Sequence, residues 1–342
     1  MQQLNLFGGA DPVLSAGTVR QKMIGTLVST LKNRPAPDPN LPLIVSYGGG
    51  TNSTALLIAM RLKGIRPSEI VFSDTGNEHP ETYRFIERFE RWLTSPWNGY
   101  SPFPGITTVR YQLQKPGKRH SACPPYQPLG TSSRLELIAL SAYLFEVGLR
   151  SSYEYTSLGE SCLTLKSMPS KAYGFGACSA KWKAQVIESY VKGKYGRARQ
   201  LVGIHAGEQR RLLQTNGHAK PLENEWFVYE YPLIEWGLEQ EDCNLLCARV
   251  LGEVPKKSSC WFCPNASVAE VRALKENYPD YYQLGCLIEQ QAMDNSKRRG
   301  VDSGSVKGLG RKFSWRAIDQ LMPLEQLAID ARKENQSCRC MD

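Results

Sequence analysis

A glycine-rich stretch is the clearest candidate for chemistry in this sequence. An apolar run over residues 41–47 predicts a buried strand, and an apolar helical segment follows over residues 54–63. Glycines between them let the backbone turn tightly and expose N–H groups, and a helix N-terminus adds unpaired N–H groups with a positive dipole end. The stretch therefore predicts a phosphate or pyrophosphate site, with a plain capped turn as the alternative. The residues expected at this site are Ser46, Gly48, Gly49, Gly50, Asn52, Ser53 and Thr54.

A second candidate follows the predicted strand over residues 69–73. Asp74 comes directly after this strand, and Thr75 and Gly76 follow it. A carboxylate at a strand end is suited to holding a metal ion or a ribose, so we expect Asp74 to act in nucleotide binding and in catalysis. A helix cap beside a glycine turn is the alternative.

Cysteine spacing indicates a further kind of chemistry. Two of the ten cysteines, Cys260 and Cys263, form a Cys-x-x-Cys turn that can grip one metal ion or one edge of a cluster. Two thiolates are too few for a closed site, so further ligands must come from elsewhere. In a cytoplasmic chain of this length, ten cysteines favour metal, cluster or thiol chemistry over disulfides.

The predicted elements place the first two candidates at one edge of a sheet. Strands alternate with helices, which predicts an α/β fold with a doubly wound, mostly parallel sheet and a cysteine-bearing C-terminal region. Ligands of such sheets bind at the carboxyl ends of the strands. We expect an N-terminal helix and proline-rich connector (1–40), a nucleotide-binding domain (41–265) and a helical, basic C-terminal region (266–342). The predicted strands are 41–47, 69–73, 106–112, 200–204 and 227–234, and the predicted helices are 19–31, 54–63, 80–93, 135–149, 179–195, 238–251, 268–276 and 320–333.

The glycine loop resembles the pyrophosphate (PP) loop of the adenine-nucleotide α-hydrolase-like enzymes. Gly49, Gly50 and Ser53 match the pattern Ser-Gly-Gly-x-Asp-Ser, while Gly48 replaces the usual serine and Asn52 the usual aspartate. The loop lacks the lysine of a Walker A motif. This resemblance implies that the loop binds the phosphates of ATP, with Mg²⁺.

Further motifs resemble the phosphoadenosine phosphosulfate (PAPS) reductase family, a branch of the PP-loop enzymes. The segment from Asp74 to Thr82 is similar to the family's second motif, Asp-Thr-Gly-x-x-x-Pro-Glu-Thr. A later segment is similar to the family's Gly-Ile-Arg motif, with a histidine in place of the arginine. The resemblance implies that these segments bind ATP, PAPS or adenylyl sulfate (APS). In the later segment, the binding residues it implies are Gly203, His205, Arg210 and Arg211.

The same resemblance extends to other cysteines. Cys178 stands where the family carries cluster cysteines, so Cys178, Cys260 and Cys263 are expected to share one inorganic centre. An iron–sulfur cluster is the preferred interpretation, zinc is the second, and no metal at all is the third. Family members that reduce sulfonucleotides carry a nucleophilic cysteine near the C-terminus, and Cys338 and Cys340 are similar to it in position.

A basic segment at residues 297–316 suggests a nucleic-acid partner. Lysines and arginines there alternate with Phe313 and Trp315, and basic residues with aromatic side chains are how single-stranded nucleic acid is held. The alternative is a solvated loop whose aromatic side chains pack inward.

Composition and motifs together leave three functions open. The formal net charge of +9 favours an anionic partner. No apolar run approaches about 18 residues and no signal pattern is found, which predicts a cytoplasmic protein with no membrane contact.

The first hypothesis is an enzyme that adenylates a substrate and delivers sulfur to nucleic acid, as relatives in DNA phosphorothioation and tRNA thiolation do, with a sulfur donor protein as a possible partner. The second is reduction of APS or PAPS by a C-terminal thiol. The third is a non-catalytic nucleotide- or nucleic-acid-binding module.

Overall fold

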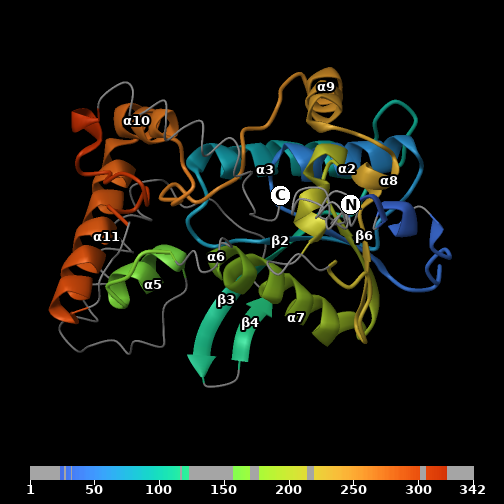
Figure 1. Cartoon of the computed structure of the whole chain (residues 1–342). Coiled ribbons are helices and arrows are strands. Elements are labelled where there is room, and N and C mark those ends of the chain that lie inside the picture. Colours follow the sequence, from blue (N-terminus) through green and yellow to red (C-terminus); the bar gives the residue numbers. More distant parts are fainter. Residues whose placement is uncertain are drawn as a thin grey trace, which may run out of the picture.

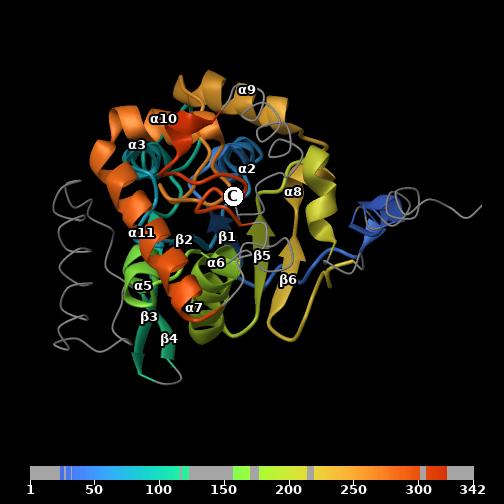
Figure 2. The ribbon, with the colours of Figure 1, turned by 60° about the vertical axis from the view of Figure 1, so that its left-hand side comes forward.

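The computed structural model describes residues 24–26, 28–31, 33–115, 118–122, 157–169, 177–213, 219–300 and 306–321. Within them the central feature is a six-stranded sheet with the order β4-β3-β2-β1-β5-β6. All neighbouring strands are parallel except β3 and β4, which are antiparallel. The predicted doubly wound, mostly parallel sheet is therefore confirmed (Figure 2). The strands are β1 (Leu43–Tyr47), β2 (Glu69–Ser73), β3 (Ile106–Lys115), β4 (Lys118–Ala122), β5 (Ala198–Val202) and β6 (Phe227–Glu230).

Helices cover both faces of this sheet (Figure 1). On one face lie α2 (Thr51–Leu62), α3 (Pro80–Thr94) and α9 (Gln240–Leu251), and on the other lies α7 (Gln185–Tyr195). Successive side chains of β1 point to opposite faces of the sheet. Ile44 belongs to the core under α7, and Val45 belongs to the core under α2. A short helix, α6 (Ala177–Ser179), and a π-helical turn, η2 (Ala180–Ala184), lead into α7.

Other elements surround the sheet. The helix α10 (Val268–Asn277) and the helix α11 (Pro279–Arg298) lie together at one side of the molecule (Figure 1). The shorter ones are α5 (Leu158–Thr164), α8 (Pro232–Glu235) and the 3₁₀ turns η3 (Ala206–Leu212) and η4 (Ile318–Gln320).

One local prediction needs correction, and two elements of the structure were not predicted. The strand expected over residues 227–234 ends at Glu230, because Pro232 starts the helix α8 instead. The antiparallel strand β4 was not expected in a polar, proline-rich stretch, and α11 was not among the predicted helices. The described residues 24–26, 28–31 and 33 are helical, in agreement with the predicted N-terminal helix.

The C-terminal helices share a core with the sheet. One buried cluster contains Ile44 and Val71 from the strands together with Val271 of α10 and Ile288 of α11. The predicted domain boundary at residue 265 stays a prediction, but apolar packing continues across it.

The aromatic residues of the basic segment belong to the same cluster. Phe313 is 1% exposed and Trp315 is 0% exposed. Of the two alternatives for these rings, the structure supports the one in which they pack inward, against the protein interior, and not the one in which they stack on nucleic acid. The basic side chains around them remain at the surface, as described below.

Several expectations lie outside the described residues. They are the helix at 135–149, nearly all of the helix at 320–333, and the tail cysteines Cys338 and Cys340. Among the described helices, none is long and apolar enough to cross a membrane.

Candidate functional site

The glycine loop joins the carboxyl end of β1 to α2. Gly49 adopts a φ of +78°, and a Cβ there would lie 3.1 Å from side-chain carbons of both Thr82 and Ile86. The N-cap residue of α2 is Gly50, and no side chain caps the helix. The first N–H groups of α2 therefore lack a side-chain acceptor, which is the arrangement that binds anions at helix N-termini.

Side chains of the loop hold its shape from inside. Ser53 Oγ accepts a hydrogen bond from the Gly48 N–H at 3.2 Å, and Thr54 Oγ1 lies 3.3 Å from the Tyr47 hydroxyl. Asn52 is 3% exposed, and its Oδ1 has no hydrogen-bond partner among the described residues. The loop thus combines a fixed backbone with one buried polar atom that still needs a partner.

The loop after β5 closes against the glycine loop. A Cβ on Gly203 would lie 2.9 Å from both the Cα and the N of Ser53. Such a close approach of two backbones admits only glycine. The structure therefore brings the first and third predicted motifs together.

Asp74 is buried, with its side chain fully covered. One carboxylate oxygen accepts hydrogen bonds from the Tyr83 hydroxyl at 2.7 Å and from the Gly76 N–H at 2.8 Å. The other accepts two from the Arg110 guanidinium, at 2.6 and 3.0 Å. Asp74 therefore shapes its loop by binding four protein donors, a role that its position after β2 did not reveal.

A buried ion pair that the sequence analysis missed lies beside Asp74. The Lys183 ammonium is 3.0 Å from Glu78 Oε1, and the two side chains are 7% and 0% exposed. Thr75 Oγ1 donates to Glu78 Oε1 at 3.0 Å and lies 3.2 Å from Cys260 Sγ. Lys183 comes from the π-helical turn η2, and such turns are frequent at functional sites.

The three predicted cysteines Cys178, Cys260 and Cys263 line one small pocket, together with Thr75 and Lys183. The Asn265 N–H donates to Cys263 Sγ at 3.4 Å. Among the described residues, however, no group of three or more His, Cys, Asp or Glu side chains is arranged to hold a metal ion. The chain therefore gathers soft sulfur donors in one place, without a preformed set of ligands.

Burial keeps the thiols of Cys178 and Cys260 protonated at neutral pH. Burial, together with the nearby Cys263, raises the pKa of Cys178 to about 11. Burial and the Glu78 carboxylate also raise the pKa of Cys260, although Lys183 and Thr75 act in the opposite direction.

Lys183 connects the cysteine pocket with the glycine loop. Besides the cysteine pocket, it lines a small cleft formed by Ser46, Gly48 and Ser73 at the carboxyl ends of β1 and β2. The glycine loop and the cysteines are thus neighbours, although Cys260 follows Gly48 by more than half of the chain.

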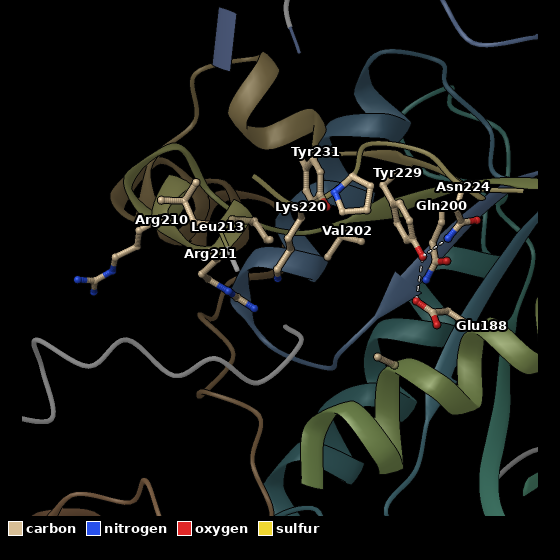
Figure 3. A pocket seen from close by; sticks show the side chains of 13 residues that line it. Glu188, Gln200, Val202, Arg210, Arg211, Leu213, Lys220, Asn224, Tyr229 and Tyr231 are labelled. Carbon is tan, nitrogen blue, oxygen red and sulfur yellow. Dashed lines mark hydrogen bonds between the residues drawn. The ribbon is translucent and has the colours of Figure 1, made fainter. Parts of the chain in front are cut away.

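The arginines of the third motif line a separate pocket of about 300 Å³ (Figure 3). Arg211 pairs with Glu208 at 2.6 Å, and Arg210 is exposed. His205 is not among the lining residues, and its Nδ1 accepts from the Gly207 N–H at 3.2 Å. The motif residues therefore separate into Gly203, which faces the glycine loop, and Arg210 and Arg211, which face this pocket.

The other end of this pocket is polar and includes no predicted residue. Figure 3 shows Glu188 and Asn224 close to the Tyr229 hydroxyl, which donates to Glu188 at 3.0 Å. Burial raises the pKa of Glu188. Gln200 donates to Ser46 at 2.9 Å and so links the pocket to β1, below the glycine loop.

The basic segment keeps a charged surface. The exposed cations of the described part are Lys297, Arg298, Arg299, Lys307, Lys312 and Arg316. Arg311 is half-buried, and its guanidinium donates to the carbonyl of Pro169.

Comparison with known proteins agrees with this geometry. The fold defines an α/β protein whose glycine loop joins the carboxyl end of β1 to the N-terminus of α2. Residues 42–124 match the model of the phosphoadenosine phosphosulfate reductase domain, and the predicted resemblance to that family is confirmed there. The match includes the glycine loop and Asp74 but not the third motif or the clustered cysteines. The uncharacterized nin region protein ORF290 of Escherichia phage lambda is 23% identical over 232 residues, which are 67% of each chain.

Proposed function

We propose that this protein is an enzyme that binds an adenine nucleotide at the N-terminus of α2 and uses it for sulfur chemistry at the cysteine pocket. The observation that carries this proposal is the position of Lys183, which lines both the cleft beside the glycine loop and the pocket of Cys178, Cys260 and Cys263. The glycine loop and the three cysteines, which lie far apart in the sequence, thereby border one shared residue.

The residues of the glycine loop fit a nucleotide. The N–H groups at the start of α2 would bind phosphate oxygens, since no side chain caps that helix. Asn52 has a buried oxygen without a partner among the residues that the structure describes, and this oxygen would accept from a ribose hydroxyl or a water on Mg²⁺. A bound ATP supplies an adenylyl group, which turns an acceptor oxygen into a leaving group. The chain itself contributes orientation and exclusion of water, because the loop is buried.

The cysteine pocket fits a sulfur-carrying centre by its donor chemistry. Three soft thiols on one wall suit an iron–sulfur cluster, or zinc as the alternative. Lys183 lies at the boundary of both clefts, and its positive charge would stabilise negative charge that develops between nucleotide and sulfur.

Nucleic acid is the preferred sulfur acceptor. The exposed cations of residues 297–316 and the net charge of +9 support it, through contacts to phosphates alone. A sulfur donor protein would then reload the centre. Reduction of APS or PAPS by a thiol of the tail is the second candidate, and it is favoured by the family match of residues 42–124. A non-catalytic binding module, motivated by Asn52 and His205, is the third.

Calorimetry with ATP and PAPS tests the nucleotide site. Gly49→Val should abolish binding, because Gly49 has a φ of +78° and its Cβ would meet Thr82 and Ile86. Gly64→Val is the matched control, since Gly64 has a φ of +69° at the other end of the same helix and open space around it. Equal nucleotide binding by the two variants and the wild type would contradict the assignment of the glycine loop as the nucleotide site.

A further inference from the structure

A buried carboxylate of α11 holds the turn at residues 307–312 in place. Glu289 is 1% exposed, and it accepts hydrogen bonds from the backbone N–H groups of Leu309 at 2.6 Å and Trp315 at 2.9 Å. Hydrogen bonds from backbone N–H groups to an ionised carboxylate are stronger than those between neutral groups. The turn is therefore a fixed part of the fold, although it belongs to the basic segment of the sequence.

Arg311 lies within this turn in a conformation that side chains rarely adopt. Its φ is +64°, in the left-handed region, and its carbonyl accepts from the Lys307 N–H at 2.7 Å. Residues other than glycine are uncommon in this region, and backbone strain of this kind gathers at functional sites. The side chains of Lys307 and Lys312 are exposed, whereas that of Arg311 is half-buried.

The Arg311 guanidinium reaches the wall of the cysteine pocket. It donates to the carbonyl of Pro169, a buried residue that lines this pocket together with Cys178. Cys178 also packs against the apolar cluster that contains Leu309 of the same turn. Burial lowers the pKa of Arg311, and negative charge on Cys178 acts in the opposite direction. Arg311 and Cys178 are thus close enough to interact electrostatically.

The positive charge of Arg311 has no carboxylate to balance it within the described residues. No ion pair joins it to an Asp or Glu there, and its buried Nε has no hydrogen-bond acceptor. A charge that is partly removed from water is normally paired, because burial disfavours an isolated charge. Lys183, the cation that lines the pocket itself, is already paired with Glu78 at 3.0 Å. Negative charge in the cysteine pocket would give Arg311 its missing partner.

We propose that Arg311 supports the cysteine pocket from outside it, where its positive charge stabilises the negative charge of a metal centre held by Cys178, Cys260 and Cys263. The inference rests on the proposed function, because that function includes the centre. A divalent metal ion bound by three thiolates carries a net charge of −1, and a nearby guanidinium in a partly buried setting stabilises that charge. Arg311 thereby differs from the exposed cations around it, which face solvent.

Metal titration of the whole chain tests this role. Metal-free protein is titrated with Co²⁺ in the absence of oxygen, because Co²⁺–thiolate bonds give an absorption band that reports on the ligands. The affinity for Zn²⁺ is then measured by competition with a chelator. We expect saturable binding with thiolate absorption in the wild type, and loss of most of that absorption in Cys178→Ser.

Variants of Arg311 separate its charge from its hydrogen bond. Arg311→Gln removes the charge but keeps an N–H donor, and it should weaken Zn²⁺ binding at least tenfold. Arg311→Lys keeps the charge and should restore most of the affinity, which a purely structural role of the guanidinium would not allow. Lys312→Gln is the matched control, since it removes the exposed cation of the next residue and should bind like the wild type. Arg311→Met provides a second neutral variant in case Arg311→Gln does not fold.

Two results would overturn the proposal: the neutral Arg311 variants bind Zn²⁺ as tightly as Lys312→Gln, or Arg311→Lys binds it as weakly as they do. Failure of the proposed function has a different signature. It appears in the wild type, as Co²⁺ titration without thiolate absorption, and it would remove the metal centre and the role of Arg311 together.

Discussion

Thr75 Oγ1 lies 3.2 Å from Cys260 Sγ, although the two residues are 185 positions apart in the chain. Thr75 belongs to the loop after β2, and Cys260 begins the Cys-x-x-Cys turn. The neighbouring residues reinforce this junction, since the Trp261 N–H donates to the Asn77 carbonyl at 3.0 Å and the His79 N–H donates to the Ser259 carbonyl at 2.9 Å. Side-chain and backbone contacts therefore join the loop after β2 to the Cys-x-x-Cys turn.

Gly203→Ala should damage the glycine loop. The added methyl would lie 2.9 Å from backbone atoms of Ser53, which cannot move without displacing the start of α2. We expect a loss of about 1–3 kcal/mol in the free energy of unfolding and at least tenfold weaker nucleotide binding. Gly193→Ala, at an open position within α7, should instead raise stability by about 0.5–1 kcal/mol. Urea unfolding and calorimetry measure both effects, and equal stability of the two variants would contradict the close approach.

Asp74→Asn should destabilise the protein by about 2 kcal/mol, because it removes the carboxylate charge from a largely buried ion pair with Arg110. Arg88→Met breaks an exposed pair with Glu253 and should cost less than about 1 kcal/mol. Nucleotide affinity should fall at least tenfold in Asp74→Asn. If Arg110→Met loses as much affinity, Asp74 acts by positioning its loop, and if it loses none, Asp74 acts on the nucleotide directly. Wild-type stability and affinity in Asp74→Asn would refute both roles.

Much of this architecture could be predicted from the chain alone. The glycine loop between β1 and α2 and the parallel strands are set by local signals, namely apolar runs, glycines and helix starts. The grouping of Cys178 with Cys260 and Cys263 came from family resemblance, and the structure places all three on one pocket.

The missed features depend on contacts between distant segments. The pairing of Glu78 with Lys183 could not be predicted, because it exists only once η2 packs against the loop after β2. For Phe313 and Trp315 the sequence left both stacking on nucleic acid and inward packing open, because local signals do not show that Trp315 packs against Gly285 and Tyr282 of α11. The strand β4 is short and polar, and pairing with β3 decides its structure.

Cys178, Cys260 and Cys263 should behave as one unit in metal binding. Each single change to serine should remove most of the iron or zinc from protein purified without oxygen, and the triple change should remove little more, because the three act on one centre. Cys247→Ser is the control, since Cys247 is buried between α9 and α2. Iron, zinc and sulfide analysis provides the measurement. A metal-free wild type, or a Cys178→Ser variant with its full metal content, would show that the cysteines do not form a metal centre.

Glu69 should make stability depend on acid pH. Burial acts to raise the pKa of Glu69, but hydrogen bonds from Thr107, Lys194, Tyr195 and Tyr190 outweigh it and hold the pKa below its ordinary value. A carboxyl with a lowered folded-state pKa stabilises the protein above its unfolded-state pKa of about 4.3, and this stabilisation is lost as pH falls through the folded-state pKa. The stability difference between the wild type and Glu69→Gln should therefore be largest near neutral pH and shrink below about pH 4.3. Urea unfolding across this range checks it, and a difference that is constant with pH would contradict the account.

Site-resolved thiol labelling tests most directly the claim that the nucleotide loop and the cysteine pocket form one site. Iodoacetamide labelling of the metal-free protein is followed by mass spectrometry with and without saturating ATP or PAPS. Cys286 of α11 has similar partial exposure to Cys178 and Cys260 and serves as the internal control. We predict that nucleotide slows labelling of Cys178 and Cys260 at least tenfold in the wild type, leaves Cys286 unchanged, and has no effect in Gly49→Val. Unchanged labelling of Cys178 and Cys260 at saturating nucleotide would contradict the account.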